Sequence, residues 1–388
     1  MSGVPSPLSP EDAPSVERRE WRRFWKIAFF ATILPFLLLT GVLEGLASYV
    51  GETYTPAQLA RELDKHPDLV WMSLHVQTHA GLKLAQVAKL RPEVLIMGDS
   101  RVGKLRANMF RPYSFYNLSR VSWPFSTYTE LLRRLPPGYR PRVIIFSVDF
   151  FMFSPQFDEH YQPMAPIYGF NLSENLAEVH NVATQMLQRP LTLLRRTDFK
   201  GRPARGLSCL LGEDAFLPDG SERTPLLSHF THNSPAFFMQ KDSWSYINAG
   251  DKMGDAQMAA LKEFVDLGKQ MGITMVAVQM PIYGPVVRAL EKDPAYGILQ
   301  DFRNHVAHGY FDKLGIPFID YINFPPYSDD YRYFFDPAHP GLPLNAAVVV
   351  ALGSDPRIHA LLPNLPLDDL RRQLQADKAA SEHLTLNQ

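Results

Sequence analysis

Ser100 lies in a short motif, Gly98-Asp99-Ser100-Arg101, directly after the apolar run Val94–Met97. A continuous apolar run of this length is typical of a strand buried on both faces of a parallel sheet. Open α/β sheets collect their active sites at the carboxyl ends of such strands, so the motif predicts a reactive serine there. The N–H groups of a following helix would stabilise a negative charge beside it. A plain helix N-cap formed by Asp99 or Ser100 is the alternative.

A second motif, Asp336-Pro-Ala-His339, lies near the end of the chain. A carboxylate three residues before a histidine can hold the ring in its Nδ1–H tautomer and leave Nε2 free to face a nucleophile. This is the division of roles in a Ser-His-Asp triad, here in the chain order Ser, Asp, His. A proline-rich loop with an Asx turn is the alternative for this motif alone.

The elements that would position both motifs alternate between strands and helices. Five apolar runs predict strands: Val94–Met97, Phe115–Leu118, Val143–Val148, Met275–Met280 and Pro317–Asp320. Amphipathic stretches between or after them predict helices: Ser126–Leu135, Asp255–Met271, Ile298–Leu314 and Leu344–Leu352. This order predicts an α/β fold, an open doubly wound domain of three layers around a parallel sheet. Ser100 follows the first strand of this pattern and Asp336 follows the last.

The N-terminal region predicts a membrane anchor. Five basic residues precede an uncharged run, Ile27–Leu43, and the flanking residues extend the candidate transmembrane helix over 27–50. This length suits a single membrane span, and the basic flank places the N-terminus in the cytoplasm and residues 51–388 outside it. A cleaved signal peptide and a buried core helix are the alternatives.

The chain divides into five parts by composition. Residues 1–26 form a Pro/Ser-rich and then basic cytoplasmic segment, 27–50 the anchor, and 51–90 a helical connector. The globular domain covers 91–360 and contains an insertion over about 151–250 that is rich in proline, aromatic residues and histidine. The tail, 361–388, is expected to be an amphipathic or fraying helix after the domain ends.

Composition excludes several classes of protein. The 388 residues are 46% hydrophobic and 20% charged, which excludes a wholly disordered chain or a coiled-coil rod. The net charge of −1 gives no global basic excess that would indicate a nucleic-acid partner. The single cysteine, Cys209, allows no intramolecular disulfide and no Cys-based zinc site. No cofactor is implied by any motif.

The pairing of the two motifs resembles the SGNH (GDSL-like) hydrolase and acyltransferase superfamily over roughly residues 91–356. The resemblance implies a flavodoxin-like α/β/α domain. It also implies that Ser100 is the nucleophile, His339 the general base and Asp336 the residue that orients it. The Ser100 N–H would form part of the oxyanion hole.

Two departures from the family pattern concern the oxyanion hole. The stretch 116–123 contains no glycine where the family has one that donates an N–H, and Asp149 follows the third strand where the family has an asparagine. An aspartate cannot donate as asparagine does unless it is protonated. We therefore expect Asn117, or a backbone N–H from Ser119 to Trp123, to face Ser100. We expect Asp149 to point elsewhere or to pair with a cation such as Arg101.

The anchor and the altered third block resemble the DltD-like and AlgJ/AlgX-like branch of that superfamily. This resemblance implies O-acylation, with acetyl or D-alanyl groups, of a cell-envelope polysaccharide or a teichoic-acid-like polymer outside the inner membrane. It implies a membrane-bound O-acyltransferase as partner. A tethered esterase fits the anchor equally well. The alternative from another class is a non-catalytic scaffold or polymer-binding partner that retains the SGNH shell.

Other candidate sites carry weaker signals. The stretch 98–105 nearly spells a phosphate-binding P-loop, but Leu105 replaces the serine or threonine that would bind Mg²⁺. His229 and His232 are spaced for a metal site without a third ligand, so loop histidines are the preferred interpretation and no metal is predicted. Arg101 and Lys104 beside Ser100 either attract an anionic substrate or are solvated surface charges.

Overall fold

The computed structural model describes most of the chain outside the insertion. The described residues are 15–74, 79–121, 124–160, 180, 182–185, 187–189, 191, 196–198, 200–223, 234–240, 247 and 250–385. Residues 1–14 of the predicted cytoplasmic segment lie outside them. So does much of the predicted insertion.

A five-stranded parallel sheet forms the centre of a mixed α/β fold. Its strands, in the order in which they pair, are β3 (Phe115–Ser119), β2 (Val94–Gly98), β4 (Val143–Ser147), β8 (Thr274–Gln279) and β9 (Phe318–Asp320). Every residue of β2, β3 and β4 is buried, as continuous apolar runs predict. The five predicted strands are therefore confirmed. Numbered along the chain, the order is 2-1-3-4-5, which has its topological switch point beside β2, where ligands bind in open sheets.

Helices pack on this sheet through aromatic and aliphatic side chains. The helices of this part are α5 (Phe125–Arg133), α11 (Asp255–Gln270), α12 (Gly284–Leu290), α13 (Gly297–Ala307), α14 (Tyr310–Lys313), α15 (Leu342–Ser354), α16 (Pro356–Leu361) and α17 (Leu367–Thr385). The Phe264 ring of α11 contacts Phe146 of β4 and Tyr128 of α5, with centroids 5.0 and 5.4 Å apart. The predicted helix 298–314 is broken into α13 and α14, because Gly309 between them adopts a left-handed conformation (φ 71°).

The C-terminal tail belongs to the main core. Leu370 and Leu374 of α17 are buried and the helix packs against α15. The prediction of a tail that follows the end of the domain is therefore corrected: the amphipathic helix is present, and its apolar face covers α15.

A small second sheet joins the connector to the insertion. Its strands pair in the order β5 (Ala204–Arg205), β1 (Val70–Trp71), β6 (Ala215–Phe216) and β7 (Glu222–Arg223). Helices α3 (Pro56–Lys65), α4 (His79–Leu90) and α9 (Leu207–Leu211) contribute buried side chains to its core, whereas α6 (Pro155–His160) and α10 (Pro235–Phe238) pack into the core of the main sheet. The connector is helical in α3 and α4, but β1 lies between them because its strand partners come from the insertion.

The buried Lys83 of α4 links the insertion to the end of β3 through hydrogen bonds. Its Nζ donates to the carbonyl oxygens of Ser119 at 2.7 Å, Gly220 at 2.8 Å and Asn117 at 3.2 Å. Burial lowers the pKa of Lys83 well below its ordinary value, although Glu222 opposes this. The ammonium therefore depends on these carbonyls, and they hold the hairpin 215–223 against the carboxyl edge of the main sheet.

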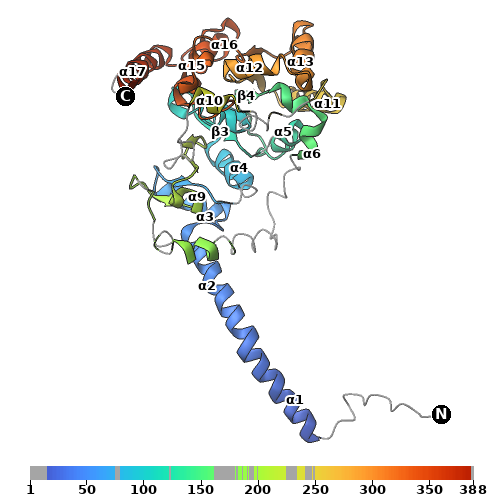
Figure 1. Cartoon of the computed structure of the whole chain (residues 1–388), viewed down its shortest axis with the longest axis vertical. Helices are drawn as coiled ribbons and strands as arrows, with labels where there is room; N and C mark the ends of the chain where they lie inside the picture. Colours follow the sequence, from blue (N-terminus) through green and yellow to red (C-terminus); the bar gives the residue numbers. More distant parts are fainter. Residues whose placement is uncertain are drawn as a thin grey trace, which may run out of the picture.

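One long helix precedes both sheets. It runs as α1 (Ser15–Ala28), a π-helical stretch η1 (Phe29–Ile33) and α2 (Leu34–Val50), and Figure 1 shows it projecting from the rest of the described chain. Residues 18–50 are long and apolar enough to cross a membrane. Most of their side chains are exposed, so the alternative of a buried core helix does not fit. Only the last turns, at Leu43, Ala47 and Val50, pack into the small second core.

Candidate active site

Ser100 lies where β2 ends and the short 3₁₀-helix η3 (Ser100–Val102) begins. Gly98 allows this turn: its φ is 153°, and a Cβ there would lie 2.3 Å from Ser147 Oγ. Asp99 accepts a hydrogen bond from the Arg101 N–H at 2.9 Å and caps η3. The capping role predicted as an alternative thus belongs to Asp99 and leaves the Ser100 hydroxyl free for another partner.

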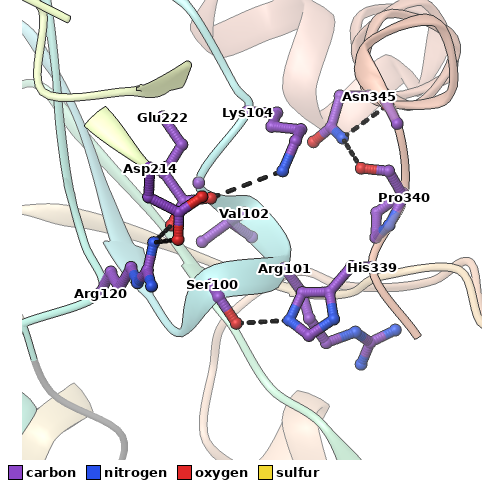
Figure 2. A network of polar contacts seen from close by, with 12 residues as sticks. Ser100, Arg101, Val102, Lys104, Arg120, Asp214, Glu222, His339, Pro340 and Asn345 are labelled. Carbon is purple, nitrogen blue, oxygen red and sulfur yellow. Dashed lines mark hydrogen bonds and ion pairs between the residues drawn. The ribbon is translucent and has the colours of Figure 1, made fainter. Parts of the chain in front are cut away.

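That partner is His339. Ser100 Oγ lies 2.6 Å from His339 Nε2, and His339 Nδ1 lies 2.6 Å from Asp336 Oδ2 (Figure 2 shows the first contact). The other Asp336 oxygen accepts the N–H groups of Ala338 and His339, both at 3.0 Å. The carboxylate is thereby fixed against the ring, which places a proton on Nδ1 and leaves Nε2 to accept from the hydroxyl. The sequence prediction that these three side chains meet is confirmed as geometry.

The electrostatics of His339 suit a general base. Burial alone would lower the pKa of His339, but the Asp336 carboxylate attracts the imidazolium and hydrogen-bonds to it, so the pKa lies above its ordinary 6.5. Lys104 opposes this increase. A raised pKa makes the neutral imidazole a stronger base toward the serine hydroxyl.

Arg101 is buried and contacts three other segments at the carboxyl edge of the sheet. Its Nε donates to the Ala338 carbonyl at 3.0 Å, its Nη2 donates to the Met280 and Pro281 carbonyls at 2.5 and 2.9 Å, and its Nη1 donates to Asp149. The predicted pairing of Asp149 with Arg101 is confirmed. The interpretation of Arg101 as a group that attracts an anionic substrate is corrected, because its guanidinium is enclosed by protein.

Asp149 is fully buried at the end of β4. Burial raises its pKa well above the ordinary value; Arg101 opposes this, and the neighbouring Asp99 carboxyl adds to it. Asp149 lies against the Arg101 guanidinium rather than facing Ser100, as the sequence predicted.

The Asn117 amide and the Ser119 N–H do not supply the missing oxyanion donors. The Asn117 Nδ2 donates to the carbonyls of Val102 and Leu105, both at 2.9 Å, and its Oδ1 accepts the Ser119 N–H at 2.9 Å. The amide therefore holds the loop after Ser100 in place, which corrects the prediction for both residues. The other residues predicted as backbone donors include Ser122 and Trp123, which lie outside the described residues.

A cluster of charged side chains that the sequence did not predict lies beside the triad (Figure 2). Glu222 lies 3.5 Å from Lys104 Nζ, and its other oxygen lies 3.3 Å from Arg120 Nη1. Arg120 also bonds to Asp214 at 2.7 Å. Burial raises the pKa of Glu222, but Arg120, Lys104, Lys83 and His339 together lower it below the ordinary value. Asp214 and Glu222 come from the insertion, and no local spacing in the sequence connects them to Ser100.

The rival sites are not supported by this geometry. The stretch 98–105 does not form a phosphate cradle. The N–H groups of Arg101, Gly103 and Leu105 donate to acceptors within the loop, and Lys104 pairs with Glu222. Cys209 is buried, and burial raises the pKa of its thiol far above the ordinary value. His229 and His232 lie outside the described residues. Within the described part of the chain, no three His, Cys, Asp or Glu side chains group as a metal site.

Comparisons with known proteins assign no family to the chain. No family model matches the chain, and no curated protein shows significant sequence similarity to it.

Proposed function

We propose that this protein is an acyltransferase or esterase that forms an acyl-enzyme on Ser100. The observation that carries the proposal is the continuous contact from Ser100 Oγ through His339 to Asp336, 2.6 Å at each step, at the carboxyl edge of the parallel sheet. A nucleophile, a base within hydrogen-bond reach and a group that orients the base are the three parts required for this chemistry.

The reaction would proceed in two balanced halves. Ser100 Oγ attacks the acyl carbonyl while His339 Nε2 takes the hydroxyl proton, and the same proton then passes to the departing alkoxide. An acceptor hydroxyl, or water, next attacks the acyl-Ser100 carbonyl and gives its proton to Nε2. This proton returns to Ser100 Oγ as the acylated acceptor or the free acid leaves. Asp336 keeps its charge throughout and stabilises the imidazolium.

An SGNH-like relationship is part of the same proposal. It is supported by the 2-1-3-4-5 strand order, by Ser100 after the first strand of that sheet and by the Asp336–His339 loop after β9. A three-layer α/β/α arrangement and membership of the DltD-like or AlgJ/AlgX-like branch follow from it as expectations. The altered neighbourhood at Asn117 and Asp149 distinguishes this site from that of ordinary SGNH hydrolases.

The substrate proposed is a cell-envelope polysaccharide or teichoic-acid-like polymer, which would receive acetyl or D-alanyl groups from a membrane-bound O-acyltransferase partner. The support is the N-terminal helix over residues 18–50, whose end packs into the same small core as β1 and β5. This packing would keep the site close to the membrane surface.

The proposal includes an inner-membrane protein whose N-terminus lies in the cytoplasm, and the basic residues before the span support this orientation. A reporter that functions only outside the cytoplasm is expected to be active when fused after Gln388. A reporter that functions only in the cytoplasm should be inactive at the same position. The same fusion with the five basic residues of positions 18–26 changed to glutamine is the control, and it should lose its fixed orientation. A mature protein that begins near residue 50 would contradict the anchor and indicate a cleaved signal peptide.

A serine-directed phosphonate tests the proposed chemistry directly. Mass spectrometry is expected to find the adduct on Ser100 in the wild-type chain and no adduct in Ser100→Ala. A non-catalytic scaffold is the second candidate, favoured by the engagement of the Asn117 amide and Arg101 in structural contacts. Absence of any adduct from the folded wild-type chain would support the scaffold.

The pKa of His339 predicts the pH dependence of ester turnover. The base must be neutral to accept the serine proton, so kcat/KM should rise with pH, with an apparent pKa above 6.5 because Asp336 raises that of His339. Asp336→Asn removes the charge that favours the imidazolium, so the residual activity should rise at lower pH than in the wild type. A shift of this limb to higher pH in Asp336→Asn would contradict the assignment of the base.

A further inference from the structure

Most hydrogen-bond donors around Ser100 already have protein acceptors. The Ser119 N–H donates to Asn117 Oδ1 at 2.9 Å, and the Arg120 N–H donates to the Gly98 carbonyl at 2.9 Å. The Asn117 amide and the Arg101 guanidinium are engaged in the same way. A tetrahedral intermediate on Ser100 would still need donors for its oxyanion beyond the Ser100 N–H, because a single donor is a weak oxyanion hole.

Arg120 follows β3, the strand that pairs with β2, and β2 leads to the nucleophile. The pairing of β2 with β3 ends at Gly98 and Ser119, so Arg120 is the first residue beyond the sheet on the strand beside Ser100. Its φ of 60° is unusual for a side chain with a Cβ, and such backbone conformations collect at functional sites. In this conformation the chain turns after β3 and the Arg120 N–H donates a hydrogen bond to the Gly98 carbonyl.

The Arg120 side chain is held at one edge and open at the other. Its Nη1 donates to Asp214 at 2.7 Å and to Glu222 at 3.3 Å (Figure 2). Within the described part of the chain, Nη1 is its only guanidinium nitrogen with a protein acceptor, which leaves the N–H groups of Nε and Nη2. About a quarter of the side chain, 24%, is exposed. A planar guanidinium fixed by two carboxylates on one edge presents a preorganised pair of donors on the other.

We propose that Arg120 is a further catalytic residue, which donates from Nε or Nη2 to the acyl carbonyl oxygen as it becomes an oxyanion. This inference rests on the proposed acyl-Ser100 chemistry. Asp214 and Glu222 act through Arg120 as positioning residues. Their negative charges balance the guanidinium in the resting site, so a neutral ester carbonyl is a better ligand than an anion. The hydrogen bonds strengthen as charge develops on the oxygen, which accelerates the reaction.

The test compares Arg120→Ala and Arg120→Lys with Arg133→Ala, using the full chain in detergent and a simple aryl ester. Arg133 is a matched control because it makes an ion pair of the same length, 2.7 Å, with Glu263 on an exposed surface away from the site. Both Arg120 variants are expected to lose about 10²–10³-fold in kcat with KM changed only a few-fold. Arg133→Ala should match the wild type.

Rescue separates a donor from a structural residue. Ethylguanidinium added to Arg120→Ala should restore at least tenfold in kcat and should not affect Ser100→Ala. If Arg120→Ala does not fold, the predicted loss in kcat is tested with Arg120→Lys alone. This variant keeps a cation for Asp214 and Glu222 but lacks the planar guanidinium. A folded Arg120 variant with wild-type kcat, or a loss in Arg120→Ala that ethylguanidinium does not restore, would overturn the proposal. If Ser100→Ala instead keeps wild-type turnover, it is the acyl-Ser100 chemistry that fails.

Discussion

Ester hydrolysis by the Ser100→Ala variant is expected to fall about 10⁵–10⁶-fold in kcat relative to the wild type. The alanine removes the only atom that can form the covalent intermediate, whereas the fold should remain, because Ser100 Oγ bonds only to His339 among the described residues. Initial rates on a chromogenic ester, measured with full-length protein whose melting temperature matches the wild type, provide the test.

The companion variants show whether the three residues act as a unit. His339→Ala should lose nearly as much as Ser100→Ala, and the double variant should lose no more than either, because each single change already disables the same step. Asp336→Asn should lose about 10⁴-fold, since it disturbs the tautomer and orientation of a base that is still present. Losses that multiply in the double variant would mean that Ser100 and His339 contribute independently, contrary to the contact between them.

The sequence predicted those residues of the site that lie close along the chain to a strand or to each other. Ser100 follows a strand within one turn, and Asp336 and His339 lie three residues apart, so neighbours along the chain determine their geometry. The strands were predictable for the same reason, since burial on both faces requires an unbroken apolar run. The pairing of Asp149 with Arg101 followed from chemistry: a buried carboxylate at the end of a strand favours a cation close by.

The parts that sequence reasoning missed depend on contacts between distant segments. Asn117 was expected to face Ser100, but its amide donates to the buried loop carbonyls of Val102 and Leu105, both at 2.9 Å. Asp214 and Glu222 reach the site from the insertion because Lys83 and the small sheet hold the hairpin there. No periodicity in 151–250 indicates this, since each strand of the small sheet is only two residues long.

The loss of Arg101 should destabilise the fold strongly. Its buried guanidinium touches the loops after β4 and β8 and the loop that carries His339, so no other described side chain can take over its contacts. Arg101→Met is expected to lower the free energy of unfolding by about 3–5 kcal/mol, as when one partner of a buried ion pair is removed. Urea unfolding of the full chain in detergent measures this, with the exposed Arg133→Met expected to change it by less than about 0.5 kcal/mol.

A second variant separates the charge of Arg101 from its role in positioning the base. Arg101→Met combined with Asp149→Leu removes both buried charges and should recover part of the lost stability, because an apolar pair can replace a buried ion pair. Turnover should not recover with it. The Ala338 carbonyl, next to His339, loses the donor that holds it at 3.0 Å, and a shift of the base by about 1 Å can cost about 10²-fold in rate. If the double variant regains wild-type turnover together with its stability, Arg101 does not position His339 and its role is confined to neutralising Asp149.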